Sequence, residues 1–223
     1  MLPAIQALVL LPNIYTHKEF IMTETGHIAH ENIETHPLAP FMPEGSRILM
    51  LGTFPPARSR WCMDFFYPNF QNDMWRIMGL CFFNDKEYFI IKGEKRFDQT
   101  LIEAFLHEQR IAVYDTARKV VRTKNTASDK DLLIVEETDI RLMLDKMPEC
   151  DTIITAGQLA TTTLCRQLDI AEPKVGHHTS FTYGSRRIKL FRMPSSSRAY
   201  PLSVERKAEQ YAKCLKERDA QAD

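Results

Sequence analysis

The chain has 223 residues, and 44% of them are hydrophobic, which suffices for one folded core with an additional terminal arm. Its 29 basic residues balance its 29 acidic ones, so net charge alone predicts no nucleic-acid partner. No apolar run is long enough to span a membrane, and the five cysteines form no CxxC pair, which argues against a zinc or iron–sulfur framework. We therefore expect a cytoplasmic protein with reduced cysteines and no metal.

The sequence predicts three segments: an N-terminal arm over residues 1–35, an α/β domain over 36–217 and a short tail over 218–223. The arm begins with MLPAIQALVLLPNIY, which is short and apolar and lacks the basic start of a signal peptide. It either packs on the domain or results from an upstream start, because Met22 would open a polar segment.

Four short apolar runs predict buried strands at residues 47–51, 110–114, 152–156 and 188–193. Helical patterns follow Asn72, occupy 97–109 and 138–147, and follow Gly157 and Ser203. A turn is expected near Tyr183, before the last strand. Strands that alternate with helices predict a three-layer α/β/α fold around a central, mainly parallel four-stranded sheet.

The loops after these strands are the expected ligand-binding region. Ligands of open parallel sheets bind beyond the carboxyl ends of the strands, here at 52–60, 115–128, Gly157 and 194–200. Residues 116–128 and 173–204 contain no Asp or Glu, and Arg58 and Arg60 follow the first strand. This distribution predicts a surface that meets phosphates, although a basic run can equally be plain solvated surface.

The first of these loops reads Gly-Thr-Phe-Pro-Pro. Gly52 permits a sharp turn or a close backbone approach, and Pro55 and Pro56 stiffen the exit. The loop lacks the dinucleotide and P-loop patterns, so it is either a rigid ligand-binding loop or a simple tight turn.

Aromatic residues follow within the next segment. Phe65, Phe66, Tyr67 and Phe70 form a group that could stack an unpaired base, and the amide of Asn72 could read a base edge or orient a water. The alternative is a core aromatic cluster with Asn72 as a helix N-cap.

The loop after the last strand contains three consecutive serines. Hydroxyl and backbone N–H groups of Ser195, Ser196 and Ser197 suit phosphate oxygens. A serine nucleophile is the alternative, but no GxSxG elbow is present. Asp115, which follows the second strand, is interpreted as a turn or cap residue.

Together these loops resemble the uracil-DNA glycosylase superfamily, whose members open with a strand and a GxxP-type loop and close with an [HL]PS-type loop. The similarity is greatest to the hypoxanthine-DNA glycosylase-like branch and covers roughly residues 36–217. The matching pieces are Gly52-Thr53-Phe54-Pro55, Phe66-Tyr67, Asn72 with Trp75, Val113-Tyr114-Asp115, Ala127-Ser128-Asp129 and Met193-Pro194-Ser195-Ser196-Ser197.

The resemblance implies a monofunctional DNA glycosylase, a monomer without cofactor, that flips a deaminated base such as uracil or hypoxanthine and hydrolyses its N-glycosidic bond. It implies Asn72 as the catalytic residue. The base-binding residues would be Gly52, Thr53, Phe54, Pro55, Phe66 and Tyr67. The DNA-binding residues would be Arg58, Pro194, Ser195, Ser196, Ser197 and Arg198.

The chain departs from the family pattern at several positions. Branches that excise uracil fast carry Asp or Asn where Phe54 stands, and Phe54 cannot activate water. Asn69-Phe70 replaces a His-Pro pair, and Met74 replaces a Phe. Phe54 in place of a polar residue favours an alternative, a catalytically weak or inactive nucleic-acid-binding protein on the same fold. A serine hydrolase is the third class considered.

Overall fold

The computed structural model of the chain describes residues 33–124 and 129–219. Most of the expected arm at 1–35, and residues 220–223 of the expected tail, lie outside these ranges. The elements are, in chain order, β1 (Ile33–Thr35), β2 (Ile48–Gly52), η2 (Arg58–Arg60), α1 (Met74–Phe83), α2 (Gln99–Glu108), β3 (Ile111–Asp115), β4 (Ala117–Arg122), η3 (Asp129–Asp131), β5 (Leu132–Glu137), α3 (Ile140–Lys146), β6 (Thr152–Ala156), α4 (Gln158–Leu168), β7 (His177–Tyr183), β8 (Arg186–Met193) and α5 (Val204–Asp219).

The main sheet contains the four expected strands side by side. Its order is β3-β2-β6-β8-β7, and the pairs β3–β2, β2–β6 and β6–β8 are parallel. The fifth strand, β7, pairs antiparallel with β8 and was not predicted, so the sheet is five-stranded and mixed. Edge strand β7 reads His-His-Thr-Ser-Phe-Thr-Tyr, which has no apolar run to mark it. The expected turn near Tyr183 is confirmed, with Gly184 at φ 59° between β7 and β8.

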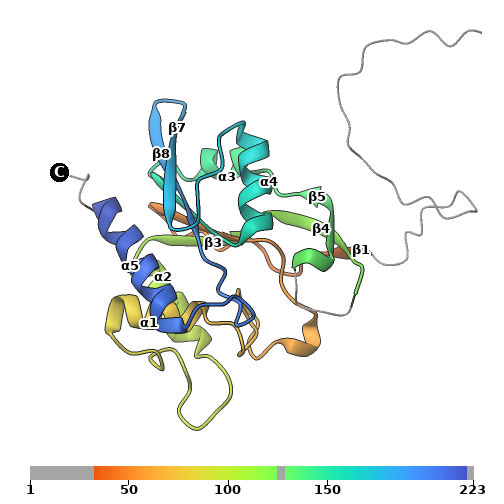
Figure 1. The fold of residues 1–223 in the computed structure, drawn as a ribbon, viewed down its shortest axis with the longest axis vertical. Helices are drawn as coiled ribbons and strands as arrows, with labels where there is room; N and C mark the ends of the chain where they lie inside the picture. The colour runs from red at the N-terminus through yellow and green to blue at the C-terminus, as the bar shows by residue number, and fades with distance from the viewer. Residues whose placement is uncertain (1–32, 125–128, 220–223) are drawn as a thin grey trace, which may run out of the picture. The chain divides into compact units, whose positions relative to one another are not determined.

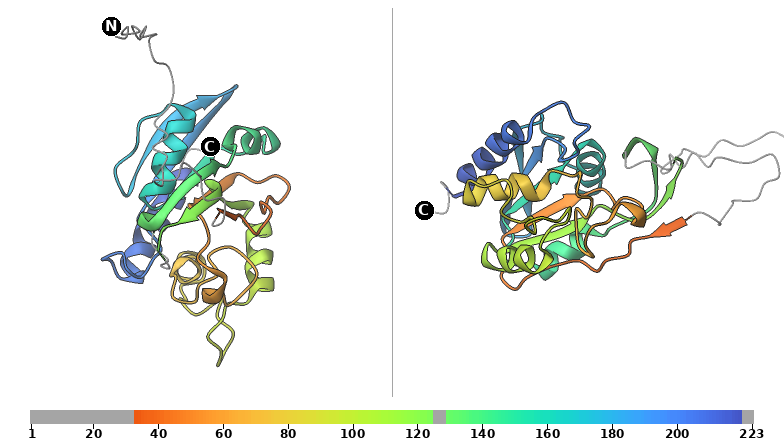
Figure 2. Two further views of the ribbon diagram at one scale, coloured as in Figure 1. Left: turned by 90° about the vertical axis from the view of Figure 1, so that its right-hand side faces the viewer. Right: turned by 90° about the horizontal axis from the view of Figure 1, so that it is seen from below.

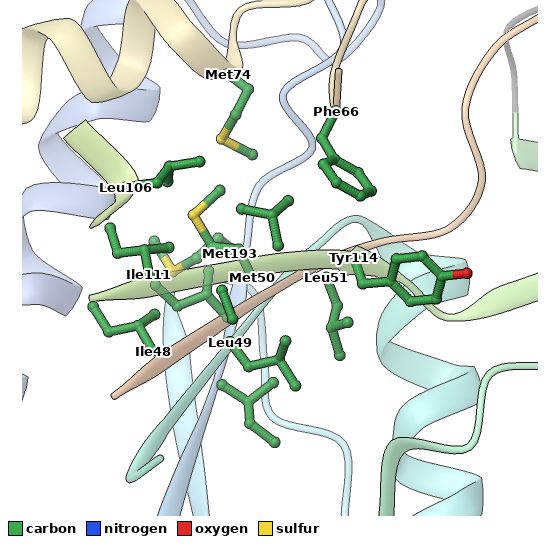
Figure 3. Close-up of a cluster of buried hydrophobic side chains, with 14 of the residues drawn as sticks. Ile48, Leu49, Met50, Leu51, Phe66, Met74, Leu106, Ile111, Tyr114 and Met193 are labelled. Carbon is green, nitrogen blue, oxygen red and sulfur yellow. The ribbon is translucent and has the colours of Figure 1, made fainter. Parts of the chain in front are cut away.

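The helices gather in two groups around this sheet, with α1, α2 and α5 on one face and α3 and α4 on the other (Figure 1, Figure 2). Each covers apolar side chains of the parallel strands, and all five residues of β2 are buried. Figure 3 shows the side chains of β2 inside a core that also contains Met74, Leu106, Ile111 and Met193. The expected cap before α5 is present, because Ser203 Oγ accepts the N–H of Arg206 at 3.2 Å.

A second, three-stranded antiparallel sheet in the order β1-β4-β5 was not predicted. β1 lies within the segment assigned to the arm, and β4 lies within the loop expected at 115–128. Strand β4 buries only Ala117 and Val120 between charged residues, so its apolar signal is too short to read as a core strand.

The basic residues of β4 are paired with acids of the neighbouring strands. Arg122 donates to Glu34 on β1 at 2.9 Å, and Lys119 lies 2.7 Å from Glu136 on β5. Arg118 lies 3.3 Å from the same Glu136. The basic residues of β4, which were expected to face phosphates, are therefore paired with acids of the same sheet.

A cation of the other acid-free stretch is structural too. The guanidinium of Arg186 donates to three carbonyl oxygens at and beyond the end of α3, those of Leu144 at 2.9 Å, Met147 at 2.7 Å and Cys150 at 3.1 Å. The last carbonyls of a helix have no partner within the helix, so Arg186 acts as its C-terminal cap. Within the two described ranges, no helix combines the length and apolar composition that crossing a membrane requires.

Replacing Arg186 by Met should lower the free energy of unfolding by about 2 kcal/mol, because three carbonyl oxygens lose a charged donor. Arg187→Met is the matched control, since Arg187 is the exposed neighbour on the same strand and should change stability by less than about 0.5 kcal/mol. Urea denaturation of both variants measures the difference, and equal losses would contradict the capping role.

Candidate functional site

A cavity of about 1140 Å³ lies at the carboxyl ends of the four parallel strands. Gly52 and Asp115 close β2 and β3, Gly157 follows β6, and the loop 194–197 follows β8; all of them line the cavity. Tyr67 and Asn72 enter from the segment between β2 and α1. The structure thus brings together residues that are far apart in the sequence, at the edge where parallel sheets bind ligands.

The floor of the cavity is formed where the ends of β2 and β3 lie close together. A Cβ on Gly52 would lie only 2.3 Å from Asp115 Oδ1, so no other residue fits there without displacing the carboxylate. Asp115 Oδ2 lies 2.9 Å from Nε2 of His36, whose Nδ1 faces the backbone of Leu38. An ionised carboxylate only accepts hydrogen bonds, so Nε2 is the donor and holds Asp115 in place.

The pairing of His36 with Asp115 was not predicted from the sequence. His36 is 2% exposed at its side chain and contacts the rings of Phe54, Phe66 and Tyr114, yet it stands alone in the sequence with no motif around it. Asp115 ends β3 and its side chain reaches the cavity, so its interpretation as a turn residue was incomplete. The sequence did give one signal for this role: Asp115 directly follows one predicted strand, and Gly52 directly follows another.

Tyr67 borders the same floor. Its hydroxyl is closed to solvent and has no hydrogen-bond partner among the described residues, and it lies 3.4 Å from the point where a Cβ on Gly52 would be. The backbone is left-handed there, with φ 49°, and the ring meets Trp75 edge-on at 6.1 Å. Burial, followed by the charge of Asp115, raises the pKa of Tyr67 well above its usual value, so the hydroxyl keeps its proton.

Asn72 lies between the start of α1 and the cavity. Its Oδ1 accepts the N–H of Met74, the first residue of α1, at 2.9 Å, which orients the amide, while Asp73 rather than Asn72 occupies the N-cap position. The side chain also lines the cavity. The amide N–H₂ group is therefore the end that remains to meet a ligand.

The serine loop 194–197 is braced against the segment that carries Asn72. Lys207 on α5 is 0% exposed, and its Nζ donates to Asp73 Oδ2 at 2.9 Å and to the carbonyl of Ser197 at 2.8 Å. Arg198 donates to the other carboxylate oxygen at 3.1 Å. The backbone N–H of Asp73 donates to the carbonyl of Ser196 at 2.9 Å, and Asn72 forms a bridge with Ser197.

A second carboxylate reaches the cavity from η3. Asp129 Oδ2 accepts a hydrogen bond from Oγ1 of Thr53 at 2.8 Å. Burial raises the pKa of Asp129, and the Thr53 hydrogen bond opposes that effect. The sequence motif that contained Asp129 also included Ala127 and Ser128, which lie outside the described residues.

Several residues assigned to base or DNA binding do not line the cavity. Phe66 is buried in the core against Phe65 and Tyr114 (Figure 3). The carbonyl of Pro55 accepts a hydrogen bond from Arg122. Phe54 reaches the cavity but also packs with Ala117 and Val120 in a small second core.

The two arginines expected at DNA are engaged within the protein. Arg58 lies over the Trp61 ring at 4.2 Å and pairs with Asp64 at 2.6 Å. Arg198 is held by Asp73, and its side chain is half exposed. Neither lines the cavity.

The serines show the geometry of a turn. Ser195 Oγ accepts the N–H of Ser197, and Ser197 Oγ accepts the N–H of Ala199, each at 3.2 Å. No hydrogen bond joins these hydroxyls to a histidine or carboxylate in the part of the chain that the structure describes, so nothing there activates a serine nucleophile.

Lys207→Met should lower the free energy of unfolding by about 3 kcal/mol, because it leaves a buried carboxylate without its closest cation. The loss is at the lower end for such pairs because Arg198 still contacts Asp73. Lys216→Met, at an exposed site on the same helix, should cost less than about 0.5 kcal/mol. Urea denaturation measures both, and a loss no larger than that of Lys216→Met would show that the brace contributes nothing.

Comparison with known proteins supports the fold. No family model matches the sequence, and no curated protein does. Among solved structures, a solution NMR structure of a protein from Methanosarcina acetivorans, described as a putative uracil DNA glycosylase, superposes with a TM-score of 0.54. It is 20% identical and covers 82% of this chain and 99% of its own. The chain therefore has a mixed α/β fold similar to that of this neighbour.

Proposed function

We propose that this chain is a monofunctional DNA glycosylase that removes a deaminated base, uracil or hypoxanthine, from DNA during base excision repair. A base inside a duplex is out of reach, so the nucleotide would flip into the cavity at the strand ends. The loop 194–197 would hold the backbone through its hydroxyl and N–H groups, and Tyr67 and Asn72 would contact the base.

The observation that carries this proposal is the buried Tyr67 hydroxyl, which lacks a partner beside the Asp115 carboxylate. A buried donor without a partner costs about 1–3 kcal/mol, which supports a role for the Tyr67 hydroxyl in binding. The hydroxyl is closed to solvent, and a small movement of the Tyr67 or Asp115 side chain on base entry would open it.

These two groups match the edge that deamination creates. Uracil and hypoxanthine present a ring N–H donor next to a carbonyl acceptor, whereas cytosine and adenine present a ring-nitrogen acceptor next to an amine. Asp115 accepts only, and Tyr67 donates because its pKa is raised. Cytosine and adenine, the bases from which uracil and hypoxanthine arise, would set a ring lone pair against the carboxylate, and sites that hydrogen-bond a specific group reject an analogue that lacks it.

The alternative is a nucleic-acid-binding protein on the same fold without activity. Phe54 favours it, because the residue that would activate water in fast uracil-excising branches is absent from that position. A serine hydrolase has no observation in its favour, since the serines of the loop are engaged in turn hydrogen bonds.

A panel of single- and double-stranded oligonucleotides, each with one uracil, hypoxanthine or xanthine, tests the proposal when followed by alkaline cleavage of abasic sites. Wild type should cleave at least one lesion, and Asn72→Ala should release no base while binding the same DNA within about threefold, because its amide meets the departing base. A wild type that binds but releases no base from any of them would support the binder alternative.

Tyr67→Phe should move stability and activity in opposite directions. Removing an unsatisfied buried hydroxyl should raise the free energy of unfolding by about 1 kcal/mol. Losing one hydrogen bond to the base should slow base release by about tenfold. Urea denaturation and single-turnover rates measure the two effects.

The matched control is Tyr114→Phe, because Tyr114 is buried in the core and does not line the cavity. It should leave base release unchanged. Parallel loss of stability and activity in Tyr67→Phe would contradict a role of its hydroxyl in base recognition.

A further inference from the structure

Hydrolysis of a glycosidic bond requires a group that positions the attacking water and takes its proton. Three residues of the cavity, Phe54, Asn72 and Asp115, do not supply such a group. Phe54 has no polar group. Asn72 uses Oδ1 to accept the N–H of Met74, and Asp115, which His36 holds in place, is assigned above to the ring N–H of the base.

Asp129 is the remaining carboxylate of the cavity. Its Oδ2 accepts the Thr53 hydroxyl at 2.8 Å, and its other oxygen has no hydrogen bond among the described residues. The carboxylate lies 3.7 Å from the point where a Cβ on Gly157 would be, and Cβ of Ser195 lies 4.0 Å from that same point. Asp129 therefore stands where the ends of β2, β6 and β8 meet.

The surroundings of Asp129 suit a proton acceptor. The Thr53 hydrogen bond and the charge of Arg122 lower the pKa of Asp129, and the charge of Asp115 raises it. The charge of Asp129 in turn raises the pKa of Tyr67. Burial is the largest effect and raises its pKa above the ordinary carboxyl range near 3.9. A carboxylate with a raised pKa takes a proton more readily near neutral pH.

We propose that Asp129 is the catalytic base of this enzyme and accepts the proton of the water that attacks C1′ of the flipped nucleotide. The inference rests on the proposed glycosylase function. In this step the water oxygen forms a bond to C1′, the bond between C1′ and the base nitrogen breaks, and its electron pair leaves with the base. One water proton goes to Asp129, which later releases it to solvent, and the base anion takes a proton from solvent. The products are the free base and an abasic sugar.

Asp129→Asn tests the inference, because it keeps the shape of the side chain and removes the carboxylate that would accept the proton. Its single-turnover rate of base release should fall by about 10²–10⁴-fold, with affinity for lesion DNA within about threefold of wild type. Asp131→Asn is the matched control, since Asp131 belongs to the same short helix, pairs with Lys124 and does not line the cavity. It should retain the wild-type rate.

The pH profile separates a base from a merely structural residue. The wild-type rate should fall as pH drops through the raised pKa of Asp129, and this acid limb should be absent in Asp129→Asn. Thr53→Val should shift the limb to higher pH, because the Thr53 hydrogen bond lowers the pKa of Asp129. This second variant retains the carboxylate and so remains informative if Asp129→Asn folds poorly.

Two results would overturn the inference. An active wild type with an Asp129→Asn variant within about threefold of its rate, or an acid limb that Thr53→Val leaves in place, excludes Asp129 as the base while the glycosylase function stands. A wild type that releases no base from any lesion removes the proposed function and this inference with it.

Discussion

The buried ion pair between Asp73 and Lys207 is the contact on which the cavity wall depends. Taking two charges out of water costs several kcal/mol per ion, so such a pair persists only where the remaining donors and acceptors are used. Here Lys207 also holds the carbonyl of Ser197, and Arg198 takes the second oxygen of Asp73. The start of α1, the serine loop and α5 are thereby joined, and Asn72 is placed opposite the ends of the strands.

The two carboxylates of the cavity lie in different environments. Asp115 is held by a buried histidine and faces the backbone of Gly52, which suits a fixed acceptor. Asp129 is held by one hydroxyl, and its burial favours the protonated form. Two carboxyl groups with unlike surroundings can perform unlike tasks, and under the proposed function these would be recognition for Asp115 and proton transfer for Asp129.

The parallel strands, all five helices and the hairpin turn could be predicted, because apolar runs, caps and a glycine turn are local signals. β4 and β7 could not, since an edge or half-exposed strand of charged and hydroxyl residues lacks an apolar run. The meeting of Gly52, Tyr67 and Asn72 followed from the rule for strand ends, but the partners of each side chain did not. His36 and Lys207 are set by tertiary contacts alone, and Phe66 was drawn into the core by its neighbours.

The pairing of Arg118, Lys119 and Arg122 with Glu34 and Glu136 has a consequence for how a polyanion would be met. Affinity for a duplex grows with the number of counterions released, and cations already matched by acids release few. These three cations would therefore contribute little to any dependence of DNA association on ionic strength. The small sheet would then offer a polyanion few unmatched cations, and contacts made at the cavity would matter more.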